Sequence, residues 1–183
     1  MLLVVAATPD ELRGAEANGA SSPFVCGVGP VEAAARTAAE LAARRPSALL
    51  LVGVAGARAF DAPAFVVGTE AIYCDADDPR WIELRAPADP ALVAAARAAL
   101  PDARAEAIGT TARVGGSSGC EVEAMEGYAV LRASAHAGVP AVEVRVLSNA
   151  VGEPDRGKWR IAEALDELRD RLPGLIEALS HAR

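Results

Sequence analysis

The chain has 183 residues, enough for one domain with a sizeable core, and we expect a single domain over residues 1–183. Its formal net charge is -7 and it contains no run of Lys or Arg, so neither a nucleic acid nor a membrane is expected as a partner. Three widely spaced cysteines and two histidines give no pattern for a disulfide framework or a metal site. We therefore expect a cytoplasmic protein with reduced thiols and with neither metal nor cofactor.

The N-terminal half alternates apolar runs with helix signals. Strands are predicted at the apolar runs 2–7, 22–26 and 47–52. The first of these is far too short to span a membrane. Helices are predicted from a cap at Thr8 to about Ala17 and, after the turn Gly27–Pro30, over residues 31–44. The third strand should end in a loop of small residues, 53–58.

The C-terminal half continues the alternation. Further strands are predicted at residues 65–75 with an interruption at Gly68, at 81–85, at 105–114 and at 141–147. A glycine-rich loop is predicted at 115–119, and helices at 90–100 after an Asp89 cap, at 124–136 and at 155–171. Pro173 and Gly174 should separate the last helix from a final turn at 175–181. This order of strands and helices predicts a three-layer α/β domain with a largely parallel sheet.

The segment 121–149 carries the most informative polar residues. Glu126 lies near a predicted helix start, and Arg145 lies inside a predicted buried strand whose end delivers Ser148 and Asn149 into a loop. Ligands of open α/β sheets bind beyond the carboxyl ends of the strands, so these residues are candidates for a site. Charges inside a buried strand are costly unless they are paired, so Arg145 and its neighbour Glu143 require partners.

Each candidate residue also has a purely structural interpretation. Glu11 would complete a capping box at a helix start, and Glu126 would favour a helix N-terminus through the helix dipole. Arg145 could be the ion-pair partner of Glu143, and Asn149 could be an ordinary turn residue. Taken one at a time the structural interpretations are favoured, so a functional role depends on the combination.

The turn Gly27–Pro30 lies between a strand and a helix, which is where a dinucleotide-binding fingerprint would lie. Such a fingerprint requires a third glycine, and Glu32 occupies that position instead. A tight turn is therefore favoured over a pyrophosphate-binding loop, and a plain cofactor-binding module is a weak alternative.

Four motifs taken together resemble the nucleoside phosphorylase/nucleosidase superfamily, which includes methylthioadenosine/S-adenosylhomocysteine nucleosidase. In the order found in that superfamily, they are Gly27–Ala34, Gly53–Gly56, Met125–Gly127 and Arg145–Asn149. The tail from Ser148 to Ile161 resembles that of the futalosine hydrolase family. The resemblance covers nearly the whole chain, and it implies a three-layer α/β/α sandwich whose central mixed sheet is partly closed into a barrel.

The resemblance also implies hydrolysis of an N-glycosidic bond through an oxocarbenium-like ribosyl transition state. Its catalytic residues would be Glu11 as general base for the attacking water, Arg145 to order the acids around that water, and Asn149 at the purine. The substrate-binding residues would be Val54, Ala55 and Gly56 through backbone groups, Met125 and Glu126 at the ribose, and Ser148, which orients Asn149. A carboxylate near the anomeric carbon can both accept a proton and stabilise developing positive charge.

Asn149 departs from the adenine-releasing nucleosidases, which carry Asp at this position. An Asn amide has two N–H donors, so it can donate to N7 or to a 6-oxo oxygen and fits hypoxanthine better than adenine. The resemblance thus favours hydrolysis of futalosine to hypoxanthine and dehypoxanthine futalosine, a step of menaquinone biosynthesis. Arg58, Arg113 and Arg156 are candidates for binding the carboxylated aryl group on the 5′ side of futalosine.

Three alternatives stay open. One is an adenine-releasing nucleosidase that acts on aminodeoxyfutalosine or on methylthioadenosine/S-adenosylhomocysteine. Another is a phosphorylase, which would need a cationic phosphate clamp beyond Arg145 alone. The third is a nucleoside-binding protein without turnover. The resemblance also implies a homo-oligomer, a dimer or larger.

Overall fold

The fold is a single mixed sheet with helices on both sides, seen in a computed structural model that describes residues 1–15, 21–60, 63–115 and 118–182. The sheet strands are β1 Leu2–Ala6, β2 Ser21–Val25, β3 Ala48–Ala57, β4 Phe65–Tyr73, β5 Arg85–Pro87, β6 Arg104–Thr110, β7 Val122–Ala124 and β8 Ala141–Ala150. The helices are α1 Pro30–Arg44, α2 Pro90–Ala99, α3 Gly127–Ala137 and α4 Ile161–Ser180, with short 3-10 turns η1 Asp10–Leu12 and η2 Arg156–Lys158.

Five of the strands close into a barrel. The order along the sheet is β2-β1-β3-β7-β6-β4-β5, and β8 joins its two halves because it pairs with both β3 and β4. The β3–β8 pairing is parallel and the β4–β8 pairing is antiparallel, so the sheet is mixed. The expectation of a mixed, partly barrel-like sheet is therefore confirmed. Since β8 has a hydrogen-bonded neighbour on each side over its middle part, its residues from Ala141 to Ser148 are buried.

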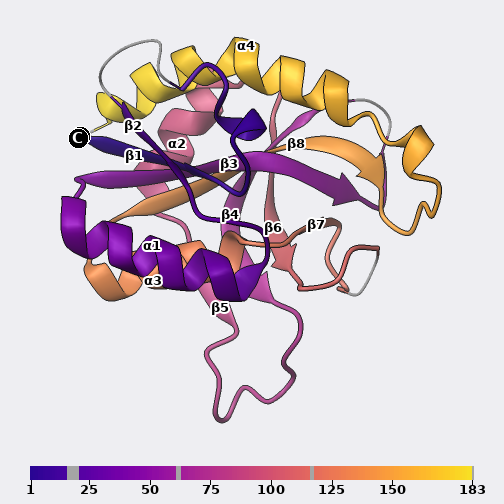
Figure 1. Cartoon of the computed structure of the whole chain (residues 1–183), viewed down its shortest axis with the longest axis horizontal. Coiled ribbons are helices and arrows are strands. Elements are labelled where there is room, and N and C mark those ends of the chain that lie inside the picture. The colour runs from indigo at the N-terminus through magenta and orange to yellow at the C-terminus, as the bar shows by residue number, and fades with distance from the viewer. Residues whose placement is uncertain (16–20, 61–62, 116–117, 183) are drawn as a thin grey trace.

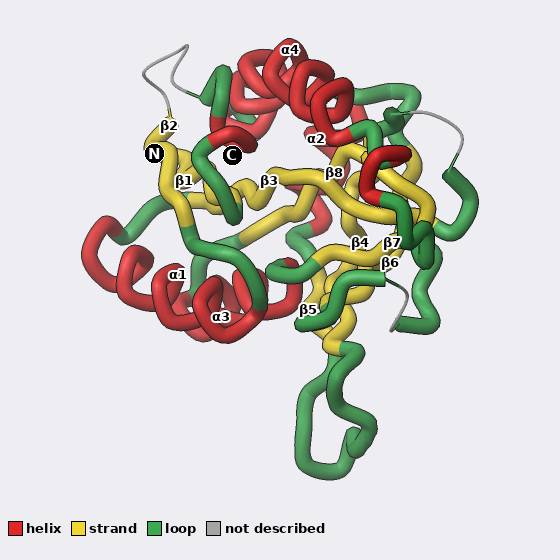
Figure 2. The backbone as a smooth tube through the Cα atoms, turned by 45° about the vertical axis from the view of Figure 1, so that its right-hand side comes forward, coloured by secondary structure: helices red, strands yellow, loops and turns green. Residues whose placement is uncertain are grey.

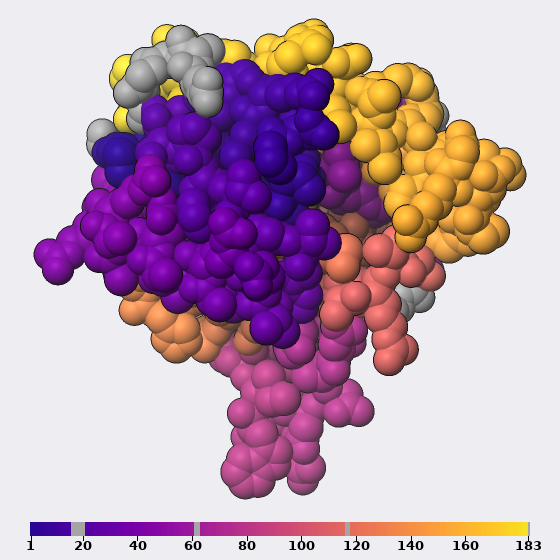
Figure 3. Space-filling view, viewed as in Figure 1, coloured from indigo at the N-terminus to yellow at the C-terminus, as the bar shows by residue number. Residues whose placement is uncertain are grey.

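The helices form the outer two layers of the sandwich. Figures 1 and 2 show α1 and α3 packed together on one side of the sheet and α2 and α4 packed together on the other. The hairpin that joins β4 to β5 projects from this body as an arm, and it carries Trp81 with 84% of its surface exposed (Figures 1 and 3). Within the described part of the chain, no helix combines the length and apolar character that a membrane crossing requires.

The helix predicted after Thr8 is wrong in extent. The described residues form only the 3-10 turn η1, and the predicted end at Ala17 falls outside them. The side chain of Glu11 accepts hydrogen bonds from the backbone N–H and the hydroxyl of Thr8, as in the expected capping box. The chain then turns at Gly14, whose φ of +92° is accessible mainly to glycine.

Two predicted loops are strand. β3 continues past Val52 to Ala57, and β8 continues past Leu147 to Ala150, so Ser148 and Asn149 belong to a strand. Each extension is stabilised by pairing with the other strand, and the end of β3 also pairs with β7. The register of β3 against β8 shifts between Ala55 and Gly56, which leaves Ser148 without a partner residue in this pairing.

The helix predicted from residue 124 begins at Gly127, because residues 122–124 form the short strand β7. Strand β6 ends at Thr110 rather than at residue 114, and β4 ends at Tyr73 without a break at Gly68, where only its register against β6 shifts. β5 covers Arg85–Pro87 instead of residues 81–85, most of which lie in the arm. The predicted loop 115–119 lies partly outside the described residues.

Helix α4 differs from its prediction at both ends. It begins at Ile161 rather than at residue 155, since Asp155 caps η2 instead, and it continues through Pro173 to Ser180. A proline inside a helix removes the hydrogen bond to the carbonyl four residues earlier, here that of Arg169. That carbonyl packs against Gly14, where a Cβ would lie only 2.7 Å from the oxygen. The helix therefore tolerates Pro173 at a place where it contacts the N-terminal turn.

Candidate active site

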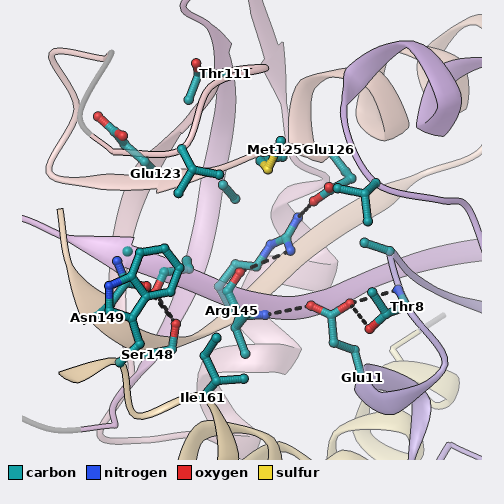
Figure 4. A pocket seen from close by; sticks show the side chains of 18 of the residues that line it. Thr8, Glu11, Thr111, Glu123, Met125, Glu126, Arg145, Ser148, Asn149 and Ile161 are labelled. Atoms are coloured by element: carbon teal, nitrogen blue, oxygen red, sulfur yellow. Dashed lines mark hydrogen bonds and ion pairs between the residues drawn. The ribbon is translucent and has the colours of Figure 1, made fainter. Parts of the chain in front are cut away.

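A cavity of about 360 Å³ opens where the carboxyl ends of β1, β3 and β8 meet the start of α3 and the segment before α4. Figure 3 shows the surface hollowed between the indigo N-terminal part and the orange segment that precedes α4. All nine residues predicted for the site line this one cavity: Glu11, Val54, Ala55, Gly56, Met125, Glu126, Arg145, Ser148 and Asn149. Four separate segments of the sequence are thus brought together, and Figure 4 shows how several of their side chains lie.

Glu11 is held by three donors. Its Oε2 accepts from the backbone N and from Oγ1 of Thr8, each over 2.9 Å, and its Oε1 accepts from the N–H of Val54 over 3.0 Å. Gly53 makes this approach possible, because a Cβ there would lie 2.5 Å from Oε1 of Glu11 and 2.4 Å from Nη1 of Arg145. The carboxylate is fixed on the cavity wall with acceptor capacity to spare.

Arg145 lies at the centre of a buried charge cluster, which we define as Glu11, Glu126, Glu143 and Arg145. Its Nε donates to Glu143 over 2.8 Å and its Nη2 to Glu126 over 3.2 Å, while Nη1 lies 3.4 Å from the carbonyl of Val54. Burial opposes the charge of Arg145, but the carboxylates of Glu143, Glu126 and Glu11 outweigh it and raise its pKa above the ordinary value. The guanidinium is therefore a permanent cation in the wall of the cavity.

Glu126 is positioned from two sides at the N-cap of α3. Its Oε2 pairs with Arg145, and its Oε1 accepts from the backbone N–H of Gly29 over 3.0 Å. Gly29 has a φ of +87° and directs its N–H toward this carboxylate from the start of α1. The turn Gly27–Pro30 is thus a tight turn that holds an acid of the cavity, which agrees with the structural interpretation of that motif.

Ser148 and Asn149 form the end of the cavity farthest from Thr8 in Figure 4. Oγ of Ser148 donates to Oδ1 of Asn149 over 2.9 Å, and Nδ2 of Asn149 donates to the carbonyl of Ala150 over 3.1 Å. Gly56 leaves room for the amide, since a Cβ there would lie 3.0 Å from Nδ2. The amide is therefore held in one orientation, and Nδ2 has a second N–H for which the described residues give no partner.

Sequence reasoning missed part of the cavity wall. Thr8 was assigned only to a helix cap, yet both of its donors fix Glu11. The apolar wall comes from the start of α4 and the segment before it, and from the segment after β6; its members include Trp159, Ile161, Leu165 and Val114. The tail resemblance includes Trp159 and Ile161 without giving either a role at the site, and no sequence signal assigned Leu165 or Val114 to it.

The structure separates the three arginines considered for the 5′ group. Arg113 lines the cavity. Arg58 instead donates from Nε to the carbonyl of Cys120 over 2.9 Å and lies 3.6 Å from Glu123. The guanidinium of Arg156 lies 5.5 Å from the ring centroid of Trp159. Arg58 and Arg156 are absent from the described lining of the cavity, which leaves Arg113 as the candidate that reaches it.

Fold and cavity define a member of the phosphorylase superfamily. The model of that family, described as "Phosphorylase superfamily", matches residues 22–120, more than half of the chain, and the chain belongs to it. Within this family, the chain is 49% identical over 61 residues to the futalosine hydrolase of Streptomyces coelicolor and 40% identical over 65 residues to that of Thermus thermophilus. These matches cover 33% and 36% of this chain but only 26% and 29% of the relatives, about a quarter of their length.

Solved structures agree with the fold over nearly its whole extent. S-adenosylhomocysteine nucleosidase from Streptococcus pyogenes superposes with a TM-score of 0.83 at 22% identity, covering 96% of this chain and 95% of that one. A futalosine hydrolase mutant from Helicobacter pylori superposes with a TM-score of 0.77 at 16% identity, covering 97% of this chain and 96% of that one. The mixed, partly closed sheet is thus the architecture of known nucleosidases.

Proposed function

We propose that the chain is a cytoplasmic nucleosidase that hydrolyses the N-glycosidic bond of a purine nucleoside. The observation that carries the proposal is the convergence of Glu11, Glu126 and Asn149 on one cavity, although they are far apart in the sequence. A cavity of about 360 Å³ is of the size that holds small ligands. The names of the relatives, a futalosine hydrolase and an S-adenosylhomocysteine nucleosidase, support the same reaction class.

In this proposal Glu11 accepts a proton from the attacking water as the bond between ribose and base breaks. Its three hydrogen bonds hold it ready for that step, and a positioned general base contributes about 10²–10⁴ in rate. Glu126 binds ribose hydroxyls, with Met125 against the sugar. The carboxylates also stabilise the positive charge that develops on the ribosyl group.

We propose futalosine as the substrate, with hypoxanthine as the released base. The support is the orientation of Asn149: Oδ1 faces the hydroxyl of Ser148, and Nδ2 has a second N–H, beyond its bond to the carbonyl of Ala150, that it would donate to the purine. A donor at this place matches N7 or the 6-oxo oxygen of hypoxanthine. The futalosine hydrolases among the relatives also support futalosine as the substrate.

The runner-up is an adenine-releasing nucleosidase, since the structural neighbour from Streptococcus pyogenes is a nucleosidase for S-adenosylhomocysteine. A phosphorylase is disfavoured by the charge cluster. Nε and Nη2 of Arg145 already pair with Glu143 and Glu126, which neutralise its charge and leave fewer of its donors for a phosphate.

The test is incubation of the purified protein with futalosine, followed by chromatography of the released base. We expect hypoxanthine at a rate independent of added phosphate. Release of adenine from aminodeoxyfutalosine or methylthioadenosine with no hypoxanthine would transfer the proposal to the runner-up. No release from any of these nucleosides would refute hydrolysis.

We also propose that the chain forms a homo-oligomer. The projecting arm with its exposed Trp81 is a surface that a second copy would cover. Light scattering coupled to gel filtration tests this, and Trp81→Ser should weaken the assembly.

A further inference from the structure

Glu143 is the member of the charge cluster that does not line the described cavity. It lies in the middle of β8 with 0% of its surface exposed, behind Arg145 as seen from the cavity. Its neighbours in the sheet are Leu51 on β3 and Gly68 on β4, neither of which carries a charge. Nothing in the proposed chemistry uses this carboxylate directly, so its place in a buried strand requires an explanation.

Two glycines make room for this side chain. A Cβ on Gly127, the first residue of α3, would lie 2.2 Å from Oε2 of Glu143. A Cβ on Gly68 would lie 3.3 Å from the Cβ of Glu143. A Cβ only 2.2 Å from Oε2 would force a displacement, so glycine at residue 127 lets the start of α3 pack against the carboxylate of Glu143. Glu126 is the N-cap of this helix.

Stability alone is a poor explanation for this arrangement. Oε1 of Glu143 accepts from Nε of Arg145, but Oε2 has no hydrogen-bond partner among the described residues. A buried carboxylate with one unbonded oxygen is costly, and buried ion pairs are frequently no more stabilising than apolar residues of similar size. The effect of Glu143 is on geometry. It holds Nε of Arg145, while Nη2 of the same guanidinium pairs with Glu126.

Resting on the proposed nucleosidase function, we propose that Glu143 is a positioning residue, which fixes Arg145 from behind so that Arg145 holds Glu126 in place at the ribose. With Glu143 the cluster has three carboxylates around one guanidinium. The excess negative charge lies next to the position where the ribosyl cation would form, and such preorganised charge is effective in a buried site.

The titration of the cluster follows from its surroundings. Arg145 on the same strand and Glu126 at the start of α3 are the charged groups that face Glu143, and Glu11 from η1 acts on it through Arg145. Burial raises the pKa of Glu143, while the charge of Arg145 opposes that shift. As the pH falls, Glu143 takes up a proton and its pairing with Arg145 weakens. Glu143→Gln copies this protonated state at every pH.

The experiment measures kcat against pH for the full chain and three variants. We expect Glu143→Gln to lower kcat by about ten- to a hundredfold, as a displaced catalytic group does, and to move the acid limb of the profile to lower pH. Glu143→Asp should lower kcat and keep the acid limb, because the shorter side chain displaces Arg145 but still titrates. Glu167→Gln, the same change on the exposed face of α4, should match the wild type in both respects.

Wild-type kcat in Glu143→Gln would overturn the role, and so would a lower kcat with an unmoved acid limb, since a purely structural loss gives that result. A thermal melt checks that each variant is folded. If Glu143→Gln does not fold, Glu143→Asp decides: a lower kcat with the melting temperature of the wild type supports the role, and wild-type kcat overturns it. An inactive wild type would refute the proposed function itself, and this role with it.

Discussion

Ser148 and Asn149 are joined side chain to side chain, with Oγ of Ser148 donating to Oδ1 of Asn149 over 2.9 Å. Nδ2 of Asn149 donates to the carbonyl of Ala150, so one N–H of the amide is left for a ligand. Both residues lie where the register of β3 and β8 shifts. This irregularity in the strand pairing therefore lies at the residue pair that orients the Asn149 amide.

Asn149→Asp should change which purine is accepted. A carboxylate replaces the N–H donor by an acceptor, so it leaves the 6-oxo oxygen of hypoxanthine without its partner. An unpaired buried polar group costs about 1–3 kcal/mol, which is roughly ten- to a hundredfold in kcat/KM. We expect kcat/KM for futalosine to fall by that factor and the ratio of the 6-amino to the 6-oxo substrate to rise. An unchanged ratio would show that Asn149 does not contact the base.

Glu11→Gln should abolish most of the turnover and leave binding intact. The amide keeps the size of the side chain but cannot accept a proton from water, so kcat should fall by about 10²–10⁴-fold. Isothermal titration with the nucleoside checks that affinity stays within a few-fold. Glu177→Gln, an exposed position on α4, serves as the control with the same chemical change. A non-catalytic binding protein would show no difference between these two variants.

Gly53→Ala should damage the site more than the fold. The added methyl would lie 2.4 Å from Nη1 of Arg145 and 2.5 Å from Oε1 of Glu11, and both groups are tied to other partners. Displacement of a catalytic group by about 1 Å can cost on the order of 10²-fold in rate. We expect a loss of kcat of this size with a cooperative melting transition retained. Wild-type kcat would mean that Glu11 and Arg145 adjust freely.

Gly174→Ala provides the matched comparison for that variant. Gly174 lies inside α4, and nothing lies within 4 Å of the place where its Cβ would be. Alanine stabilises a helix interior by about 0.5–1 kcal/mol relative to glycine, which for a chain of this size raises Tm by about 1–4 °C. We expect a higher Tm from calorimetry and wild-type kcat, and a lower Tm would contradict the helix through Pro173.

The thiol of Cys26 should be unreactive in the folded protein. Burial, assisted by the nearby charge of Glu126, raises its pKa to about 12, and burial raises the pKa of Cys74 to about 11. The thiolate is the reactive form, so near neutral pH both remain protonated, and as the pH rises Cys74 ionises before Cys26. We expect iodoacetamide followed by mass spectrometry to label Cys26 only after unfolding in guanidinium chloride. Rapid native labelling of Cys26 would contradict its burial.

Local signals in the sequence predicted those elements that depend on neighbouring residues. Asp89 caps α2 as expected, by accepting from two backbone N–H groups, and Gly138 ends α3 in the left-handed conformation that glycine adopts readily. The apolar run at 141–147 was recognised as a buried strand. The elements that could not be predicted depend on pairing between strands far apart in the sequence. β3 and β8 continue past Val52 and Leu147 because they pair with each other, and the short strand β7 pairs with β3 and β6.

The site shows the same division. Spacing alone favoured a structural interpretation for each residue, and the set was assembled only through the resemblance of four motifs. The structure brings these residues to one cavity because Glu11 is tied to Val54 and Glu126 to Gly29, contacts across 43 and 97 positions of the sequence. Such long-range contacts produce no periodic pattern in the sequence. The two hydrogen bonds that Thr8 donates to Glu11 produce none either.

Strand β8 carries Arg145 and Asn149 on a single backbone that is hydrogen-bonded to β3 on one flank and, over part of its length, to β4 on the other. The spacing between Arg145 and Asn149 is therefore a constant of the barrel. A relative that accepts a different 5′ substituent would have to vary elsewhere, at the segment after β6 and at the entrance to α4. Under the proposed function, the residues that select the 5′ group can then change without altering the residues that cleave the bond.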